Sequence, residues 1–199
     1  MKRVLNVGGA SKKVPIPAHY DGWDHVLLDI DPADEADVIC DARTLTDLAA
    51  GQYDAIYCSH NLEHYWRHDL PAVLSGFVHV LHATGFAEVL VPDLKAVFND
   101  VLKSGIDLDD VLYRQSGYEI TPNDVIYGWG HQIELSGNDF YAHKNSFTSK
   151  SLTNALTAAG FPLVLIGTGF YELHALAFKS HPTAEQIELL QIQSVIQGL

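Results

Sequence analysis

Short apolar runs separated by polar joins occupy much of the first half of the chain. These runs do not alternate apolar and polar residues, as a strand with one face in water would. Continuous apolar runs of this length are typical of parallel strands covered by helices on both faces. The pattern therefore predicts five parallel strands, at residues 3–7, 25–30, 36–40, 53–58 and 86–91.

Apolar residues at helical spacing follow the fourth and the fifth of these strands. One apolar face comprises Leu70, Val73, Leu74, Phe77, Val78 and Leu81, and a second runs over residues 94–102. Asp69 and Asp93 precede these helices as N-caps, and Gly85 and Gly105 are expected to end them.

The order of these elements predicts the fold class. Strands that alternate with helices build an α/β, Rossmann-like, doubly wound and mostly parallel sheet. Near the C-terminus, apolar runs at 163–166 and 171–178 flank a glycine-rich join, which indicates a hairpin and an antiparallel last strand. Residues 11–23 contain two prolines and no apolar stripe, which indicates a loop with at most one helical turn.

Residues 105–150 differ in character from the rest of the chain. They hold seven of the chain's 20 aromatic residues, together with glycines that interrupt any long periodicity. We expect a single domain over residues 1–199, in which this aromatic-rich segment is an insertion that covers the ligand-binding edge of the sheet.

Composition and charge narrow the classes of partner. The net charge is −13, with 12 Lys and Arg against 25 Asp and Glu, which makes nucleic acid an unfavourable partner. No apolar run is long enough to span a bilayer, and the basic N-terminus lacks the apolar stretch of a signal peptide. We therefore expect a cytoplasmic protein without a membrane partner; the sequence leaves a homodimer open.

Small and acidic residues stand where the predicted strands end. The first strand runs into Gly8-Gly9, the second into Asp29 and Asp31, and the third into Asp41. Because these ends meet at one edge of a parallel sheet, they are placed to bind a nucleotide, with a carboxylate on the ribose hydroxyls. Taken singly, each has an ordinary explanation: a tight turn after a strand, or an acid facing water.

In their order and spacing these segments resemble the class I S-adenosylmethionine-dependent methyltransferases. The chain has LNVGGAS at its first motif, SHNLEHY after the fourth strand, and VPDL after the fifth. The resemblance implies the class I methyltransferase fold, S-adenosylmethionine as cofactor and S-adenosylhomocysteine as product. Ala10 departs from the family, which usually has glycine there, and the family's first helix is weak in this chain.

The resemblance also implies which residues bind the cofactor. The set carried over is Asn6, Val7, Gly8, Gly9, Ala10, Asp29, Ile30, Cys40, Asp41, Ala42, Ser59, His60 and Leu62. Within it, Asp29 matches the family's ribose-binding acid and Asp41 the acid on the adenine side.

Methyl transfer is an in-line displacement that requires no metal, so we expect none. A histidine is the natural base for an oxygen or nitrogen acceptor, and the candidates are His60, His64, His131 and His143. The insertion is expected to bind the acceptor, for which a small molecule is the favoured class, through Tyr127, Trp129, His131, Tyr141 and His143.

Two other classes remain as alternatives. A nicotinamide-dependent oxidoreductase would require G-x-G-x-x-G, and the six positions from Gly8 fail this pattern at the third and sixth places. A non-catalytic protein that keeps the fold and acts through a partner is the other alternative, because the glycine motif is altered at Ala10.

Overall fold

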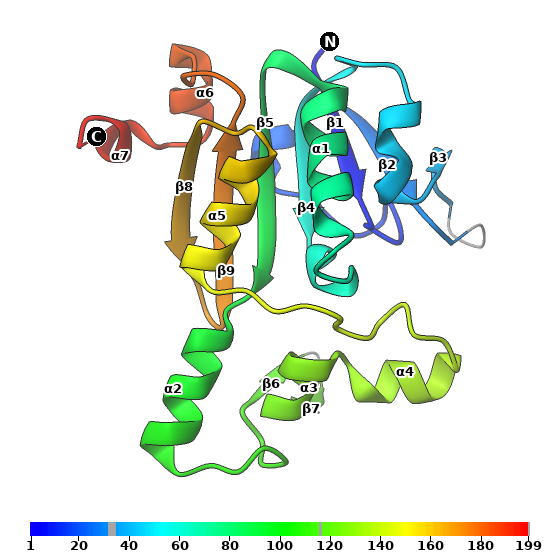
Figure 1. Cartoon of the computed structure of the whole chain (residues 1–199), viewed down its shortest axis with the longest axis vertical. Helices are drawn as coiled ribbons and strands as arrows, with labels where there is room; N and C mark the ends of the chain where they lie inside the picture. Colours follow the sequence, from blue (N-terminus) through cyan, green and yellow to red (C-terminus); the bar gives the residue numbers. More distant parts are fainter. Residues whose placement is uncertain (32–34, 116, 199) are drawn as a thin grey trace.

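The computed structural model describes residues 1–31, 35–115 and 117–198. Its main sheet has seven strands in the order β3-β2-β1-β4-β5-β9-β8 (Figure 1). The strands are β1 (Arg3–Val7), β2 (Asp24–Asp29), β3 (Val38–Ile39), β4 (Tyr53–Ser59), β5 (Leu81–Pro92), β8 (Leu163–Thr168) and β9 (Glu172–Phe178).

Strand directions confirm the predicted fold class. β1 pairs in parallel with β2 and β4, β2 with β3, and β4 with β5. β9 is antiparallel to both of its neighbours, β5 and β8. The carboxyl ends of the parallel strands therefore meet at one edge of the sheet, with the strand order reversing between β1 and β4.

The first long helix ends differently from the prediction. α1 (Leu70–Val80) passes directly into β5 at Leu81, so Gly85 lies inside a strand and does not end the helix. Asp69 stands at the N-cap but makes no capping bond, because its backbone is helical and not extended. Its carboxylate accepts a bond from Arg43 instead.

The second long helix follows the prediction at both ends. The Asp93 side chain accepts hydrogen bonds from the backbone N–H groups of Lys95 and Ala96 at the start of α2 (Leu94–Ser104). Gly105 ends the helix in the left-handed conformation, with φ at +68°.

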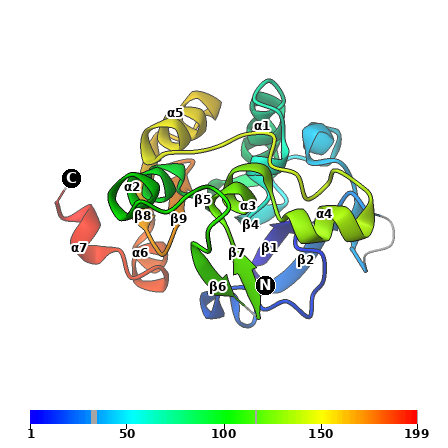
Figure 2. The same ribbon diagram turned by 90° about the horizontal axis from the view of Figure 1, so that it is seen from below.

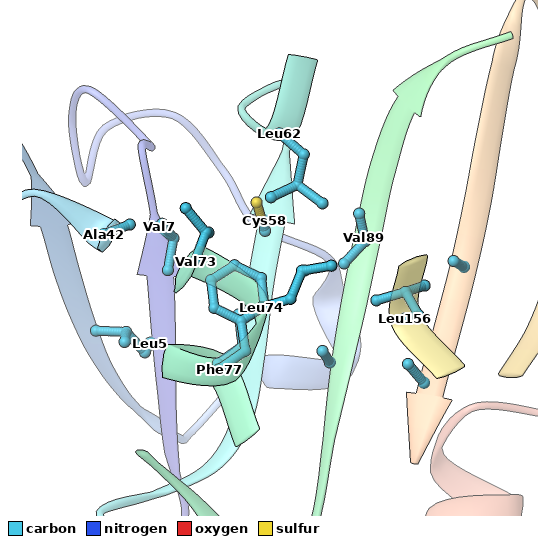
Figure 3. Packing of buried hydrophobic residues seen from close by; sticks show 14 of the residues in the cluster. Leu5, Val7, Ala42, Cys58, Leu62, Val73, Leu74, Phe77, Val89 and Leu156 are labelled. Carbon is cyan, nitrogen blue, oxygen red and sulfur yellow. The ribbon is translucent and has the colours of Figure 1, made fainter. Parts of the chain in front are cut away.

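The two faces of the sheet are covered by different kinds of structure. α1, α5 (Ser149–Ala159) and the 3₁₀ helix η2 (Ala42–Asp47) cover one face, where Phe77 and Leu74 pack against Leu5, Cys58 and Val89 (Figure 3). The other face packs against the 3₁₀ helix η1 (Ala18–Tyr20) and the short C-terminal helices α6 (Ala184–Leu189) and α7 (Gln193–Ile196). As predicted, residues 11–23 form a loop whose single helical element is η1.

The segment between α2 and α5 builds its own small elements. They are the two-stranded ribbon β6 (Tyr113–Gln115) and β7 (Tyr118–Ile120), followed by α3 (Pro122–Tyr127) and α4 (Gly130–Ser136). α3 and α4 lie beyond the carboxyl ends of β4 and β1 (Figures 1 and 2). Among the described residues, no helix has the length and apolar character needed to cross a bilayer.

Candidate functional site

The turn after β1 needs glycine at its first position. Gly8 has φ at +72°, and its N–H donates to the carbonyl of Leu28 over 2.8 Å. A Cβ atom at this position would lie 2.0 Å from Nδ2 of Asn61. The turn is therefore packed closely against the segment that follows β4, and a larger residue would disrupt the edge of the sheet.

The Asp29 carboxylate holds this turn from the end of β2. Its Oδ2 accepts from the N–H of Ala10 over 3.2 Å, and its Oδ1 accepts from the N–H of Asp31 over 3.1 Å. Ala10 has φ at +54°, the left-handed region that favours glycine. The departure from the family's glycine therefore carries backbone strain, and the bond to Asp29 helps to hold it.

Asp41 caps η2 and pairs with Arg43. The Arg43 guanidinium contacts its carboxylate over 2.6 Å and also reaches Asp69 over 3.4 Å. Burial alone would raise the pKa of Asp41, but the hydrogen bonds from Arg43 outweigh burial and keep this pKa below its ordinary value. Asp41 is therefore a fixed anion at this edge of the sheet.

Two cavities open at the carboxyl edge, and they meet at His60. The smaller one, of about 300 Å³, is lined by the turn after β1 and by the acids after β2 and β3, with Gly8, Ala10, Asp29 and Asp41 among them. The larger one, of about 610 Å³, is lined mainly by the ribbon β6–β7, by α3 and by residues 170–172. Only His60 appears in the walls of both, within the described residues.

His60 is held by two carboxylates. Its Nε2 lies 2.9 Å from Oε2 of Glu172, and its Nδ1 lies 3.4 Å from Oε1 of Glu63. Burial would lower the pKa of His60, but these carboxylates raise it to about 10. At neutral pH the ring is an imidazolium that has no lone pair with which to accept a proton. This state does not suit the role of base expected for it.

The other predicted histidines lie in different surroundings. His64 lines the smaller cavity and His143 the larger one. Burial lowers the pKa of His143, so this ring is neutral at neutral pH. His131 is exposed, contacts the rings of Tyr118 and Trp129, and lines neither cavity.

Several other predicted residues also lie away from the cavities. Of the cofactor set, Gly8, Ala10, Asp29, Ile30, Asp41 and His60 line the smaller cavity. Its other members are not in the cavity walls: Asn6, Val7, Gly9, Cys40, Ala42, Ser59 and Leu62. Val7, Ala42 and Leu62 belong to the apolar core instead.

The expected acceptor residues are divided between the cavities. Trp129 and His143 line the larger cavity, whereas Tyr141 lines the smaller one. Tyr127 is 67% exposed and lines neither.

Sequence reasoning missed part of both walls. Asn61, Arg43 and Lys144 line the smaller cavity, and Tyr113, Tyr171 and Glu172 the larger one. Asn61 and Arg43 each lie within three residues of a predicted site residue, which is a local signal. Glu172 reaches His60 because β9 pairs with β5; the hairpin pattern predicted an antiparallel last strand but not which strand it pairs with.

This strand order, with a cavity over the ends of β1, β2 and β4, defines a Rossmann-like site at a topological switch point. Comparison with known proteins identifies the family: a model described as a methyltransferase domain matches residues 1–166, and the chain belongs to that family. The resemblance to class I S-adenosylmethionine-dependent methyltransferases is thereby confirmed, together with S-adenosylmethionine as the cofactor of the class.

Solved structures share the fold at low sequence identity. An S-adenosylmethionine-dependent methyltransferase from Archaeoglobus fulgidus is 16% identical with a TM-score of 0.58, over 89% of this chain and 86% of that chain. The 1,6-didemethyltoxoflavin-N1-methyltransferase of Burkholderia thailandensis, solved with 1,6-didemethyltoxoflavin and S-adenosylhomocysteine, is 16% identical with a TM-score of 0.51, over 89% and 71%. No curated protein matches the sequence significantly.

Proposed function

We propose that this protein transfers a methyl group from S-adenosylmethionine to a small-molecule acceptor. The observation that carries the proposal is the pair of cavities that meet at His60. Methyl transfer requires the donor and the acceptor to be held together in near-attack geometry, and adjoining cavities at one sheet edge meet that requirement.

The residues of the smaller cavity fit the donor. Each oxygen of Asp29 accepts one backbone N–H, and a carboxylate has about four acceptor positions, so capacity for two ribose hydroxyls remains. Asp41, fixed by Arg43, offers an anion for the exocyclic amine of adenine. Gly8 and Ala10 of the turn line the same cavity as these acids, which places the backbone of the turn beside a bound ligand.

The larger cavity fits a small acceptor with an aromatic or otherwise flat body. The rings of Tyr113, Tyr118 and Trp129 form apolar walls, while Arg114 and Glu172 supply polar contacts. A volume of about 610 Å³ lies in the ordinary range of small-molecule sites. In this proposal residues 105–150 are an insertion within a single domain, and they form most of the acceptor wall.

The chain's own residues need only bind the donor and the acceptor, orient them and exclude water. S-adenosylmethionine supplies a methyl group activated by a sulfonium, whose charge is lost in the transfer. Glu63 and Glu172 together outnumber the single positive charge of His60, so the junction between the cavities favours a cation. His60 acts here as a positioning residue that binds the Glu172 carboxylate and lies beside that of Glu63.

Transfer of a labelled methyl group tests the proposal. The protein is incubated with S-adenosylmethionine labelled in its methyl group and with fractionated small metabolites, and label is sought in each fraction. We expect one fraction to become labelled, and Asp29→Ala to lower the rate. Binding of the donor without transfer to any metabolite or protein fraction would contradict the proposal and favour a non-catalytic role.

A further inference from the structure

A carboxylate and two imidazoles converge beside His60, and methyl transfer as proposed above makes no use of them as a group. Glu63 and His64 belong to the 3₁₀ helix η3 (Leu62–His64), and His143 belongs to the segment between α4 and α5. One ligand-type atom from each of the three residues lies within 4.8 Å of the others.

The Glu63 carboxylate is buried without a hydrogen bond. Its side chain is 1% exposed, and neither oxygen accepts a bond from any residue that the structure describes. Nδ1 of His60 is 3.4 Å away but outside hydrogen-bond geometry, so it offsets the charge only in part. A buried carboxylate in this state is costly, and a bound cation would remove the cost.

Both histidines present a lone pair. Nδ1 of His64 lies 3.1 Å from the carbonyl oxygen of Ala142, and Nδ1 of His143 lies 2.9 Å from that of Val125. Because a carbonyl only accepts, each Nδ1 must carry the proton, and in the neutral ring Nε2 keeps its lone pair. Nε2 of His143 lies 4.0 Å from Oε1 of Glu63. Histidines that ligate metals in proteins are oriented in this way by a carbonyl or carboxylate.

The backbone fixes these distant segments against each other. The carbonyl of Glu63 accepts from the N–H groups of Lys144 and Asn145, over 2.8 and 3.0 Å. Gly128 packs on the same segment so closely that a Cβ atom there would lie 2.1 Å from the carbonyl oxygen of Tyr141. The three side chains are therefore held in place before any ligand binds.

We propose that Glu63, His64 and His143 bind a divalent transition-metal ion of the Zn²⁺, Mn²⁺ or Fe²⁺ kind. Two imidazoles and one carboxylate suit these ions, whereas Mg²⁺ and Ca²⁺ prefer sites made of oxygen atoms. Three protein ligands leave a coordination position open, and His143 also lines the larger cavity. The group for that position is an oxygen atom of the acceptor, which makes hydroxyl-bearing or carboxylate-bearing acceptors the favoured class.

Metal binding can be measured without the donor or the acceptor, so its failure is distinguishable from failure of the proposed methyl transfer. Chelator-treated protein is titrated with Co²⁺, followed by visible absorption, and with Zn²⁺, followed by calorimetry. We expect one ion per chain, and at least about tenfold weaker binding of Mg²⁺. Absence of Co²⁺ and Zn²⁺ binding by the folded protein would overturn the proposal.

Variants locate the site. Glu63→Gln and His143→Gln each remove one ligand, and each should weaken Co²⁺ binding by at least about tenfold. The matched controls are Glu134→Gln and His68→Gln, whose side chains are exposed and lie outside both cavities, and they should bind as the wild type does. If Glu63→Gln fails to fold, His143→Gln decides alone. Unchanged Co²⁺ binding by a folded ligand variant would overturn the proposal.

Discussion

Two buried glutamates, Glu63 and Glu88, have equal burial but opposite surroundings. Each is 1% exposed. Glu88, on β5, accepts hydrogen bonds from the Tyr20 hydroxyl over 2.7 Å, from Nε2 of His174 over 2.7 Å and from Nε2 of His19 over 2.9 Å. Glu63, at the carboxyl edge, accepts none from the described residues.

The comparison distinguishes the Glu88 carboxylate, whose hydrogen bonds stabilise the fold, from the Glu63 carboxylate, which is open to a ligand. The partners of Glu88 come from η1, in the loop before β2, and from β9, so its network ties η1 to the sheet. The Glu63 side chain accepts no hydrogen bond from the described residues, whereas its backbone carbonyl accepts two. We therefore expect changes inside the sheet to cost stability and changes at the carboxyl edge to cost ligand binding.

The largest expected effect is on stability at Glu88. Glu88→Gln removes the anion from three hydrogen bonds and should lower the free energy of unfolding by about 3 kcal/mol. Glu63→Gln, in metal-free protein, should change it by less than about 1 kcal/mol, because the Glu63 carboxylate makes no hydrogen bond and His60 offsets the cost of burying its charge only in part. Urea denaturation of both variants measures the difference. Equal losses of unfolding free energy in the two variants would contradict this distinction between the two glutamates.

Asp29→Ala should cost donor binding, and its structural effect should be confined to the turn that its carboxylate holds. A charge-assisted hydrogen bond contributes about 1.5–3 kcal/mol, so affinity for S-adenosylhomocysteine should fall by about tenfold or more. Asp31→Ala is the matched control at the same strand end and should have a smaller effect. Calorimetry measures both. A larger loss of affinity in Asp31→Ala would mean that Asp31, and not Asp29, binds the ribose.

Trp129→Ala tests, in the wall of the larger cavity, whether a residue at the carboxyl edge serves ligand binding and not stability. Trp129 lines the larger cavity, is 36% exposed and packs edge-on against Tyr118, with 5.0 Å between ring centroids. Its truncation should lower methyl transfer by about tenfold or more and leave donor affinity within a few-fold, because only acceptor positioning is lost. Phe98→Ala, on the exposed face of α2, is the control and should transfer normally. A large fall in melting temperature with normal activity of the folded fraction would contradict this account.

The smallest expected effect is on the pH dependence of stability. The hydrogen bond to Glu88 raises the pKa of His174, despite the opposing effect of burial, and Glu172 adds to the increase. His19 and Tyr20 face the same carboxylate. A histidine whose pKa is higher in the folded than in the unfolded state stabilises the fold. This stabilisation is complete at pH values below the ordinary histidine pKa of about 6.5, and it is lost as the pH rises through the folded-state pKa. Denaturation from pH 6 upward should show this loss in the wild type and a flatter profile in His174→Gln; parallel profiles would refute it.

Local sequence signals predicted the parts of the fold that local physics decides. The strands followed from continuous apolar runs, and α2 followed from Asp93 and Gly105, whose capping needs only neighbouring backbone. Gly85 misled the prediction because β5 begins directly after α1, at Leu81, which already pairs with Tyr53; Gly85 lies where the register between β5 and β4 shifts.

The candidate site was predictable only in part. Gly8, Asp29 and Asp41 follow their strands directly, so their positions at the carboxyl edge could be inferred from order alone. The state of His60 could not, because it depends on Glu172, which lies 112 residues away in sequence. The position of Glu63 beside His143 could not be inferred either, because it depends on the hydrogen bonds that Lys144 and Asn145 donate to the Glu63 carbonyl.

Donor binding tests the central claim most directly. Calorimetry of the wild-type protein with S-adenosylhomocysteine and, separately, with NADH compares the two cofactors that a Rossmann-like edge could hold. The account predicts binding of S-adenosylhomocysteine that is at least about tenfold tighter than that of NADH, and that weakens in Asp29→Ala. Tighter binding of NADH would contradict it.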